Sequence, residues 1–291
     1  MIRMTARSAL ILAVASLVGL ITLVWPLLLH DPGSTRVQPP FVFLALLPVV
    51  VAVVLAELAQ GGLDPRVLAI LGVLTAIDAV LRGISAGTGG VELVFFLIIL
   101  AGRVFGPAFG FVLGCTSLFV SALVTAGVGP WLPYQMLCSA WIGLGAGLLP
   151  RASGKAEIAL LAAYGVVVSY AYGLLLNLQG WPTLAGVSIP GHHEQLAFDP
   201  AASLAENLGV FLRYTLITST TSYDTMRAIT TAVAVVLLGG AVLTPLRRAA
   251  RRATVSGVVA APAAPGGETV GRARRRGQPG ERLPGGAPHG R

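Results

Sequence analysis

Long apolar runs, separated by short segments rich in glycine, proline or charged residues, alternate along most of the chain. Eight runs are apolar enough to predict membrane-spanning helices, at residues 8–29, 41–60, 67–81, 91–101, 109–126, 133–149, 158–178 and 225–246. A helix needs about 20 mainly apolar residues to cross about 30 Å of hydrocarbon. By that measure the fourth run is short unless it extends through Val104, and the sixth is close to the lower limit. The pattern predicts an all-α polytopic membrane protein with about eight transmembrane helices.

Residues 101–150 form the most continuous apolar part of the pattern, with Arg103 as the one charged side chain. Between the two runs in this stretch lies AGVGPWLPYQ (residues 126–135), whose glycines and prolines interrupt a helix. Backbone groups outside a helix are tolerated at a membrane only near water or where they line a cavity. The stretch therefore predicts a helical hairpin whose structured, aromatic-tipped loop lies at one face of the bilayer.

Residues 204–219 are apolar but are interrupted by Glu206, Asn207 and Arg213. This mixture favours an amphipathic or re-entrant helix that lies over the outer mouth of the protein, ahead of a last span that begins at Thr225.

Composition supports the membrane prediction, because 55% of the residues are hydrophobic and only 11% are charged, against about 25% charged in a typical soluble domain. The net charge of +8 is concentrated at one end. Residues 247–291 hold ten arginines against Glu268 and Glu281, and the rest of the chain is neutral. With almost no large apolar side chain, residues 249–291 are expected to be a disordered, Arg/Pro/Gly-rich tail.

Basic residues also predict the orientation. Arg3 and Arg7 precede the first apolar run, and the arginines after Leu246 follow the last one. Cytoplasmic loops carry an excess of arginine and lysine. We therefore expect a multi-pass protein of the plasma membrane with both termini in the cytoplasm.

Motifs for catalysis are missing from the sequence. It contains no GxxxxGK[ST] for nucleotide phosphates, no HExxH, no GxSxG and no Cys/His set with metal-ligand spacing. We predict no metal site and no cofactor. Cys115 and Cys138 fall within predicted spans and are interpreted as small core residues, with a metal or redox role as the alternative.

Charged side chains within or next to the spans are the main functional candidates, because a charge in hydrocarbon costs several kcal/mol and usually faces a cavity or a partner. Asp78 and Arg82 have the spacing of a helical ion pair, and so do Asp224 and Arg227. Together with aromatic and amide residues on the same predicted outer side, they suggest a cup for a polar small molecule. Alternatively, the pairs only satisfy each other at the interface.

In that cup, Trp131 and Tyr134 are expected to stack on the ligand, and the backbone amides of Gly127 and Gly129 to act as donors. The full set of predicted substrate-binding residues is Gly127, Gly129, Trp131, Tyr134, Gln135, Asp78, Arg82, Glu92, Asn177, Trp181, Tyr223, Asp224 and Arg227. A second predicted surface is the small-residue face of the third span, where another helix can approach closely. It consists of Ala69, Gly72, Ala76 and Ala79.

Three segments carry a resemblance to a known family: GRVFGPAFGFVLG (residues 102–114), SALVTAGVGPWLPYQM (residues 121–136) and SYDTMRAITTAV (residues 222–233). They resemble the substrate-specificity (S) components of energy-coupling factor (ECF) vitamin transporters, and most of all the actinobacterial cobalamin type. The resemblance covers residues 66–248 and implies a six-helix core. It leaves residues 1–65 as two additional N-terminal helices.

The resemblance implies a vitamin-binding membrane subunit, with cobalamin or a related corrinoid as the first guess for the ligand. Similar proteins capture the vitamin outside, associate with a membrane coupling subunit and two cytoplasmic ATPases, and topple in the bilayer to release it inward. Small residues on their first core helix contact the coupling subunit, and the matching positions here are Ala69, Gly72, Ala76 and Ala79. Two alternatives stay open: an intramembrane enzyme such as a lipid-linked transferase, with Asp78 and Asp224 as its first candidates, and a non-catalytic scaffold.

Overall fold

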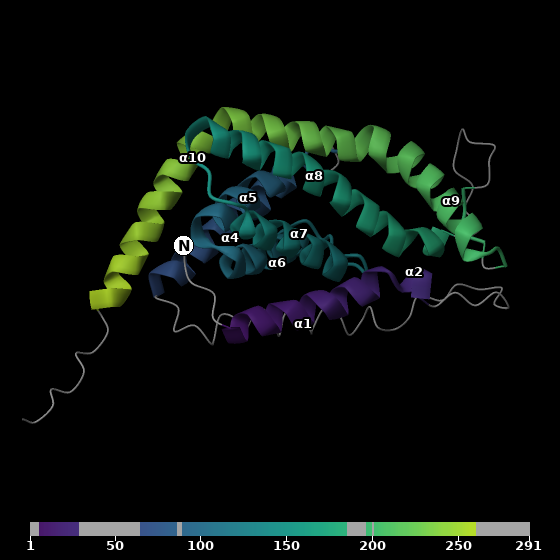
Figure 1. The fold of residues 1–291 in the computed structure, drawn as a ribbon, viewed down its shortest axis with the longest axis horizontal. Coiled ribbons are helices and arrows are strands. Elements are labelled where there is room, and N and C mark those ends of the chain that lie inside the picture. Colours follow the sequence, from purple (N-terminus) through teal and green to yellow (C-terminus); the bar gives the residue numbers. More distant parts are fainter. Residues whose placement is uncertain (1–5, 29–64, 86–88, 185–195, 200, 260–291) are drawn as a thin grey trace, which may run out of the picture. The chain divides into compact units, whose positions relative to one another are not determined.

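The computed structural model describes residues 6–28, 65–85, 89–184, 196–199 and 201–259. The described residues form helices and connecting turns, without a β-strand. The predicted span at residues 41–60 lies outside them. The helices are α1 (Ala6–Leu23), α2 (Trp25–Leu28), α4 (Pro65–Ser85), α5 (Val94–Phe105), α6 (Pro107–Val124), α7 (Leu132–Leu148), α8 (Gly154–Gly180), η1 (Trp181–Leu184), α9 (Leu204–Thr215), η2 (Leu216–Asp224) and α10 (Thr225–Val259) (Figure 1).

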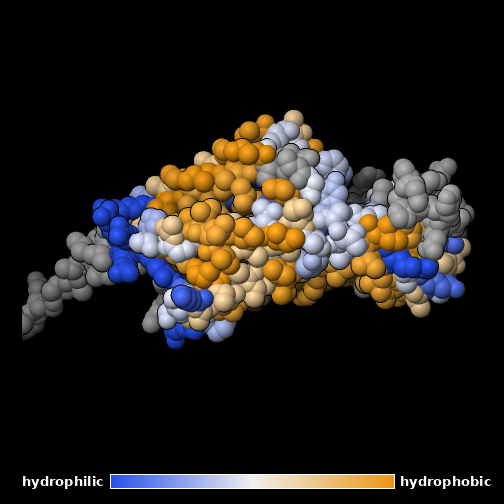
Figure 2. Space-filling model, turned by 90° about the horizontal axis from the view of Figure 1, so that it is seen from above, coloured by the Kyte–Doolittle hydropathy of each residue, from blue (hydrophilic) through white to orange (hydrophobic). Residues whose placement is uncertain are grey.

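The prediction of an all-α polytopic membrane protein is confirmed. Within the described ranges, four helical stretches are long and apolar enough to cross a membrane: Pro65–Ile84, Pro107–Val124, Gly154–Thr183 and Leu204–Ala253. Figure 2 shows the matching surface, in which a hydrophobic band adjoins hydrophilic residues gathered toward the ends of the helices.

Helix α5 is the span that the sequence predicted at residues 91–101 and that was expected to be short unless it extended through Val104; it ends at Phe105. It has 12 residues, so it is about 18 Å long, too short to cross the hydrocarbon by itself. It lies instead inside the helical unit, with eleven of its residues buried, and packs against α4, α6, α7, α8 and α10. This short central helix therefore forms the core around which the longer helices assemble.

Close approach of α6 and α7 confirms the predicted hairpin. A Cβ atom added to Gly110 would collide with the carbonyl oxygen of Gly143, and one added to Gly143 would collide with that of Gly110. Glycine at both positions thus lets the two backbones touch. The loop is shorter than predicted, because α7 begins at Leu132 with Pro133 in its first turn, where a missing N–H costs nothing.

The last helical stretch corrects two predictions. Residues 204–219 are not a separate re-entrant helix, because α9 continues through the π-helix η2 into α10. The helix also runs on through the arginine-rich segment to Val259, beyond the predicted start of the tail at residue 249. Arginine and alanine, which dominate residues 247–253, are good helix formers. Residues 260–291 lie outside the described part of the chain.

Helix α1 packs on the core through polar contacts. The indole N–H of Trp141 donates to Ser16 Oγ at 2.9 Å, and that of Trp25 donates to the carbonyl oxygen of Gln179 at 3.2 Å. A Cβ atom on Gly19 would overlap the side chain of Leu137. The first predicted span is thus part of the same helical unit as α7 and α8.

Candidate functional site

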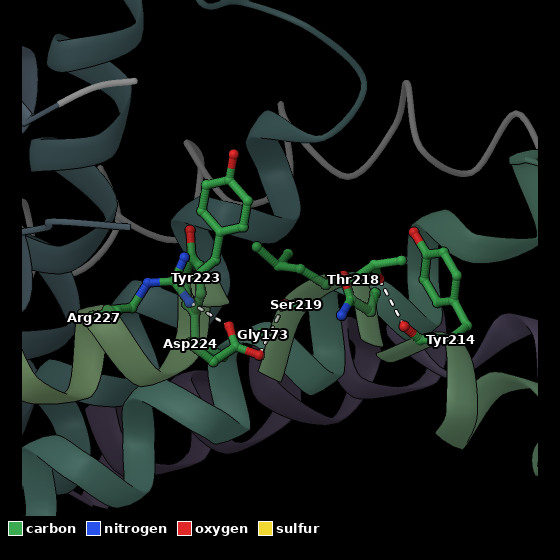
Figure 3. A pocket seen from close by; sticks show the side chains of 10 residues that line it. Gly173, Tyr214, Thr218, Ser219, Tyr223, Asp224 and Arg227 are labelled. Atoms are coloured by element: carbon green, nitrogen blue, oxygen red, sulfur yellow. Dashed lines mark hydrogen bonds and ion pairs between the residues drawn. The ribbon is translucent and has the colours of Figure 1, made fainter. Parts of the chain in front are cut away.

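A polar cavity of about 250 Å³ lies between α8, η2 and the start of α10 (Figure 3). Its wall contains three tyrosines, an amide, two hydroxyl groups and one ion pair. The lining residues are Tyr172, Gly173, Leu176, Asn177, Tyr214, Thr218, Ser219, Tyr223, Asp224 and Arg227. Such a mixture of aromatic surface with a few convergent polar groups is typical of a small-molecule site.

The sequence builds this wall with two helical periodicities. On α8, Gly173 and Asn177 are four residues apart, as are Tyr172 and Leu176, so both pairs follow one side of the helix. On the other wall the π-helix η2 replaces a regular α-helix over nine residues. A π-helix has wider turns than an α-helix. In agreement with this, the Thr225 hydroxyl donates to the carbonyl oxygen of Thr220, five residues back, at 2.6 Å.

Arg227 is the electrostatic centre of the site. Its guanidinium donates to Asp224 Oδ1 at 2.7 Å and to Glu92 Oε2, so one arginine serves two carboxylates. The guanidinium carbon also lies 5.0 Å from the ring centroid of Tyr172 and 5.8 Å from that of Phe95, within range for a cation–π contact. These three charged side chains, Glu92, Asp224 and Arg227, form what we call the acidic triad, with a net charge of −1.

Asp224 is almost completely buried and is held on a second side by Ser219, whose hydroxyl donates to Oδ2 at 2.8 Å. Figure 3 shows its carboxylate pointing toward Gly173. A Cβ atom on Gly173 would overlap that carboxylate, so glycine is needed there for α8 and η2 to approach.

Asn177 contributes the unsatisfied donor of the site. Its side-chain Nδ2 is buried and has no hydrogen-bond partner among the described residues. Leaving a buried donor unpaired costs about 1–3 kcal/mol. Because this amide is in the cavity wall, an acceptor on a bound molecule would remove that cost.

The structure brings together five of the predicted substrate-binding residues. Asn177, Tyr223, Asp224 and Arg227 line the cavity, and Glu92 binds Arg227. The predicted Asp224–Arg227 ion pair is confirmed. The prediction missed further wall residues: Tyr172, Gly173, Leu176, Tyr214, Thr218 and Ser219. For Gly173 a usable signal was its spacing of four residues from Asn177 on the same predicted span, whereas the residues on α9 and η2 lie in or next to the segment that was predicted apart from the last span.

Trp181, also predicted for the ligand site, does not line the cavity. It is buried against Phe198 and Phe211, and its indole N–H donates to the carbonyl oxygen of Leu196 at 2.8 Å. Its ring centroid is 6.3 Å from that of Tyr214, so Trp181 supports a residue that does line the cavity.

A second group of predicted residues lies between α4, α6 and α7. Arg82 donates to Ser121 Oγ at 3.0 Å and to Gln135 Oε1 at 3.1 Å. The predicted Asp78–Arg82 ion pair is not formed, because these acceptors on α6 and α7 take the guanidinium. Asp78 is fully buried, and neither carboxylate oxygen has a hydrogen-bond partner among the described residues. None of these residues lines the cavity.

The loop at residues 125–131 also differs from its predicted role. Tyr134 is fully buried in the core, so it has no free ring face on which a ligand could stack. The Gly127 amide already donates to the carbonyl oxygen of Ala122 at 2.8 Å. Trp131 is half-exposed and lies over Gly129, where a Cβ atom would overlap its ring. Turn formation thus uses the amide of Gly127 and the carbonyl oxygen of Gly129, which accepts from the Leu132 amide at 3.0 Å.

Three of the four predicted docking residues share an outward face of α4. Ala69, Gly72 and Ala76 are exposed, and no atom lies within 4 Å of a Cβ position on Gly72. Ala79 is buried at the edge of this face and packs inward, so it does not belong to the outward face on which it was predicted.

Cys115 and Cys138 are buried and free, as predicted for core residues. The described residues hold no cluster of three or more histidine, cysteine or acidic side chains that could bind a metal.

Comparison with known proteins gives one match. Residues 66–242, from α4 to the middle of α10, match the model of a family described as "ECF transporter, substrate-specific component". That range is more than half of the chain. No curated protein and no solved structure matches the chain.

Proposed function

Since the chain belongs to the family of substrate-specific components of ECF transporters, we propose that it captures its substrate in the cavity between α8, η2 and α10. Family membership makes it a substrate-binding, multi-pass membrane subunit that binds a small molecule, associates with other transporter components and is not an enzyme. The site itself is our proposal. It is carried by the unpaired amide of Asn177 in the wall of a polar, aromatic cavity.

The proposed substrate is a vitamin. Cobalamin or a related corrinoid stays the sequence-based prediction, but a cavity of about 250 Å³ is slightly smaller than the usual range for small-molecule sites, about 300–1,000 Å³. A corrinoid is considerably larger than such a cavity. Smaller vitamins with an acceptor for Asn177 and an aromatic ring for the tyrosines fit it better and belong in the same experiment.

Binding should be measured on the full-length protein in mild detergent, first by native mass spectrometry against a panel that contains cobalamin and smaller vitamins. For the vitamin that binds, calorimetry then compares two variants. Asn177→Ala should weaken binding about tenfold, because the acceptor of the bound ligand would be left unpaired at a cost of about 1–3 kcal/mol. Trp131→Ala, in the loop that does not line the cavity, should leave the affinity unchanged.

The opposite result in the two variants would place the binding site at another position. If Trp131→Ala weakens binding and Asn177→Ala does not, with both variants keeping the wild-type melting temperature, the ligand binds at the loop of residues 125–131. If no vitamin of the panel binds to any preparation of the protein, the proposal that its substrate is a vitamin is wrong.

The proposed partners are a membrane coupling subunit and two cytoplasmic ATPases, docked through the small-residue face of α4. We also propose that both termini are cytoplasmic and that residues 1–65 are an addition to the family core. Gly72→Leu tests the docking face, because its Cβ position is open and the fold should tolerate the change. Gly209→Leu on α9 is the matched control, since its Cβ position is open too.

Copurification from the native host is the measurement. The wild type and Gly209→Leu should bring down the coupling subunit and the ATPases, and Gly72→Leu should lose them. Equal recovery with both variants would exclude Gly72 from the docking face.

A further inference from the structure

A second cavity, of about 620 Å³, lies at the opposite end of α8 and α10 from the vitamin site. It is a groove between the first turns of α8 and the second half of α10. Its floor is apolar, and its rim is charged. The floor includes Ile158, Val236 and Leu243, and the rim is made by Lys155, Glu157 and Arg247.

The charge of the rim is positive. Glu157 is buried and already shared by two arginines, with Arg103 Nε at 2.8 Å from Oε1 and Arg247 Nη2 at 2.5 Å from Oε2. We call Arg103, Glu157 and Arg247 the basic triad. Its net charge is +1, and the exposed Lys155 adds another positive charge. Arg247 keeps 43% of its side chain exposed, so part of its guanidinium remains available on the groove side.

Backbone N–H groups at the start of α8 add to the positive charge around the groove. Helix α8 begins at Gly154, directly at the groove, and its N-cap residue Ser153 makes no side-chain hydrogen bond to the first turn. The first amides of a helix have no partner within it and carry the positive end of its dipole. They therefore reinforce the preference for an anion that Lys155 and Arg247 already create.

The position of the groove along the two helices corresponds to the expected depth of lipid head groups. The apolar stretch of α8 that can cross the membrane starts at Gly154, and Arg247 follows the apolar part of α10. Further arginines continue along the same helix at positions 248, 251 and 252. Basic pockets between transmembrane helices at this depth bind anionic head groups.

We propose that this groove binds one anionic phospholipid, with its phosphate held by Lys155, Arg247 and the first amides of α8, and an acyl chain on the apolar floor. The charge complementarity selects the head group, and the floor distinguishes a lipid from a free anion. This site is independent of the vitamin cavity and would be occupied whether or not substrate is bound.

Native mass spectrometry of the delipidated full-length protein in detergent tests the proposal, with dioleoyl phosphatidylglycerol and dioleoyl phosphatidylcholine as probes. Phosphatidylglycerol should bind saturably with one molecule per chain, and more tightly than phosphatidylcholine. Lys155→Gln should weaken phosphatidylglycerol binding about fivefold or more, because one cation near anionic lipid is worth about 1 kcal/mol. Lys155 is exposed, so the melting temperature should stay the same and confirm that the variant is folded.

Arg248→Gln is the matched control, because Arg248 is exposed, carries the same kind of charge next to Arg247 and does not line the groove. Its affinity for phosphatidylglycerol should equal that of the wild type. Equal losses in the two variants would mean diffuse attraction and would overturn a defined site. Equal affinity for the two lipids would overturn it as well. Displacement of the lipid by millimolar inorganic phosphate would show that the floor contributes nothing, and the lipid proposal would fail.

Discussion

The two ends of α5 carry the same kind of cluster with opposite charge. Beside its first residue, one arginine is shared by two carboxylates in the acidic triad of Glu92, Asp224 and Arg227. Near its last turn, one carboxylate is shared by two arginines in the basic triad. Both triads connect α5 to α10. The comparison shows that the same ion-pair arrangement occurs at both ends of α5 with opposite net charge, −1 in the acidic triad and +1 in the basic triad. This difference is the basis for the different ligands that we propose for the two ends.

The triads also differ in how far water can reach them. In the acidic triad the Arg227 side chain is 10% exposed and Asp224 is 1% exposed. In the basic triad Arg103 donates to the carbonyl oxygens of Leu149 and Ala152 as well as to Glu157, and Arg247 reaches solvent. Breaking a buried ion pair leaves an uncompensated charge, so the closed triad should be the more sensitive one.

Replacing the central residue of each triad should give the largest effects. Arg227→Ala leaves two carboxylates facing each other and should cost about 3–5 kcal/mol of unfolding free energy. Glu157→Ala should cost clearly less, because Arg103 keeps its two carbonyl acceptors and Arg247 can turn to water. Thermal unfolding in detergent measures both. Equal losses would show that the two ends of α5 are energetically equivalent.

Next to Arg103, the last turn of α5 should respond to side-chain volume as well as to charge. A Cβ atom on Gly102 would collide with the carbonyl oxygen of Gly143, which faces α5 and α6 together. Gly143→Ala should therefore destabilise the protein by about 1–3 kcal/mol, the usual cost of overpacking. Gly72→Ala, with open space around it inside α4, is the control and should stabilise the protein slightly, because alanine favours a helix over glycine by up to about 1 kcal/mol. If the two variants melt at the same temperature, close packing of α6 and α7 does not contribute to stability.

Glu92→Gln changes the charge of the acidic triad from −1 to zero while Arg227 keeps its bond to Asp224. Glu92 is 24% exposed, so the stability loss should be no more than about 1 kcal/mol. The larger change should appear in binding, because a cationic ligand would lose its preference for the site. Calorimetry with ligands of different charge measures this. An unchanged preference would show that Glu92 does not contribute to selectivity.

Arg247→Gln should give the smallest effect on stability. Its side chain is partly in water, and an ion pair of that kind contributes about 0.2–1 kcal/mol. The loss should also shrink in about 1 M salt, where charges are screened beyond about 3 Å. Melting curves of wild type and variant at low and high salt measure the difference. A large loss that is independent of salt would mean that the basic triad is as closed as the acidic one.

Local patterns were sufficient to predict much of the fold, since apolar runs with Gly-Pro breaks indicate where helices begin and end. The Asp224–Arg227 pair was predictable because its two residues are three apart on one helix. The Glu92–Arg227 contact joins residues 135 positions apart, and no local pattern indicates such a pair. The same holds for the basic triad, which joins three helices.

The sequence-based predictions were wrong for the segment before Thr225 and for the side chain of Tyr134. Residues 204–219 were predicted as a segment apart from the last span, because Glu206, Asn207 and Arg213 interrupt their apolar pattern. In η2 the hydroxyl groups of Thr218 and Thr221 donate to backbone carbonyl oxygens, that of Ser219 donates to Asp224, and the helix continues into α10. Tyr134 was assigned to the ligand because aromatic rings are common in binding loops, but one turn of helix at Leu132 carries it into the core.

The helical run from Leu204 to Ala253 has 50 residues, which corresponds to about 75 Å at 1.5 Å per residue. That is more than twice the thickness of the hydrocarbon, so the run cannot stand upright with both ends at the two surfaces. Such hydrophobic mismatch is relieved by tilting, by kinking or by local thickening of the bilayer. Pro245 supplies a kink within α10. Because the wall of the proposed substrate cavity belongs to the same run, a change in membrane thickness that tilts or bends the run would also change the shape of that cavity.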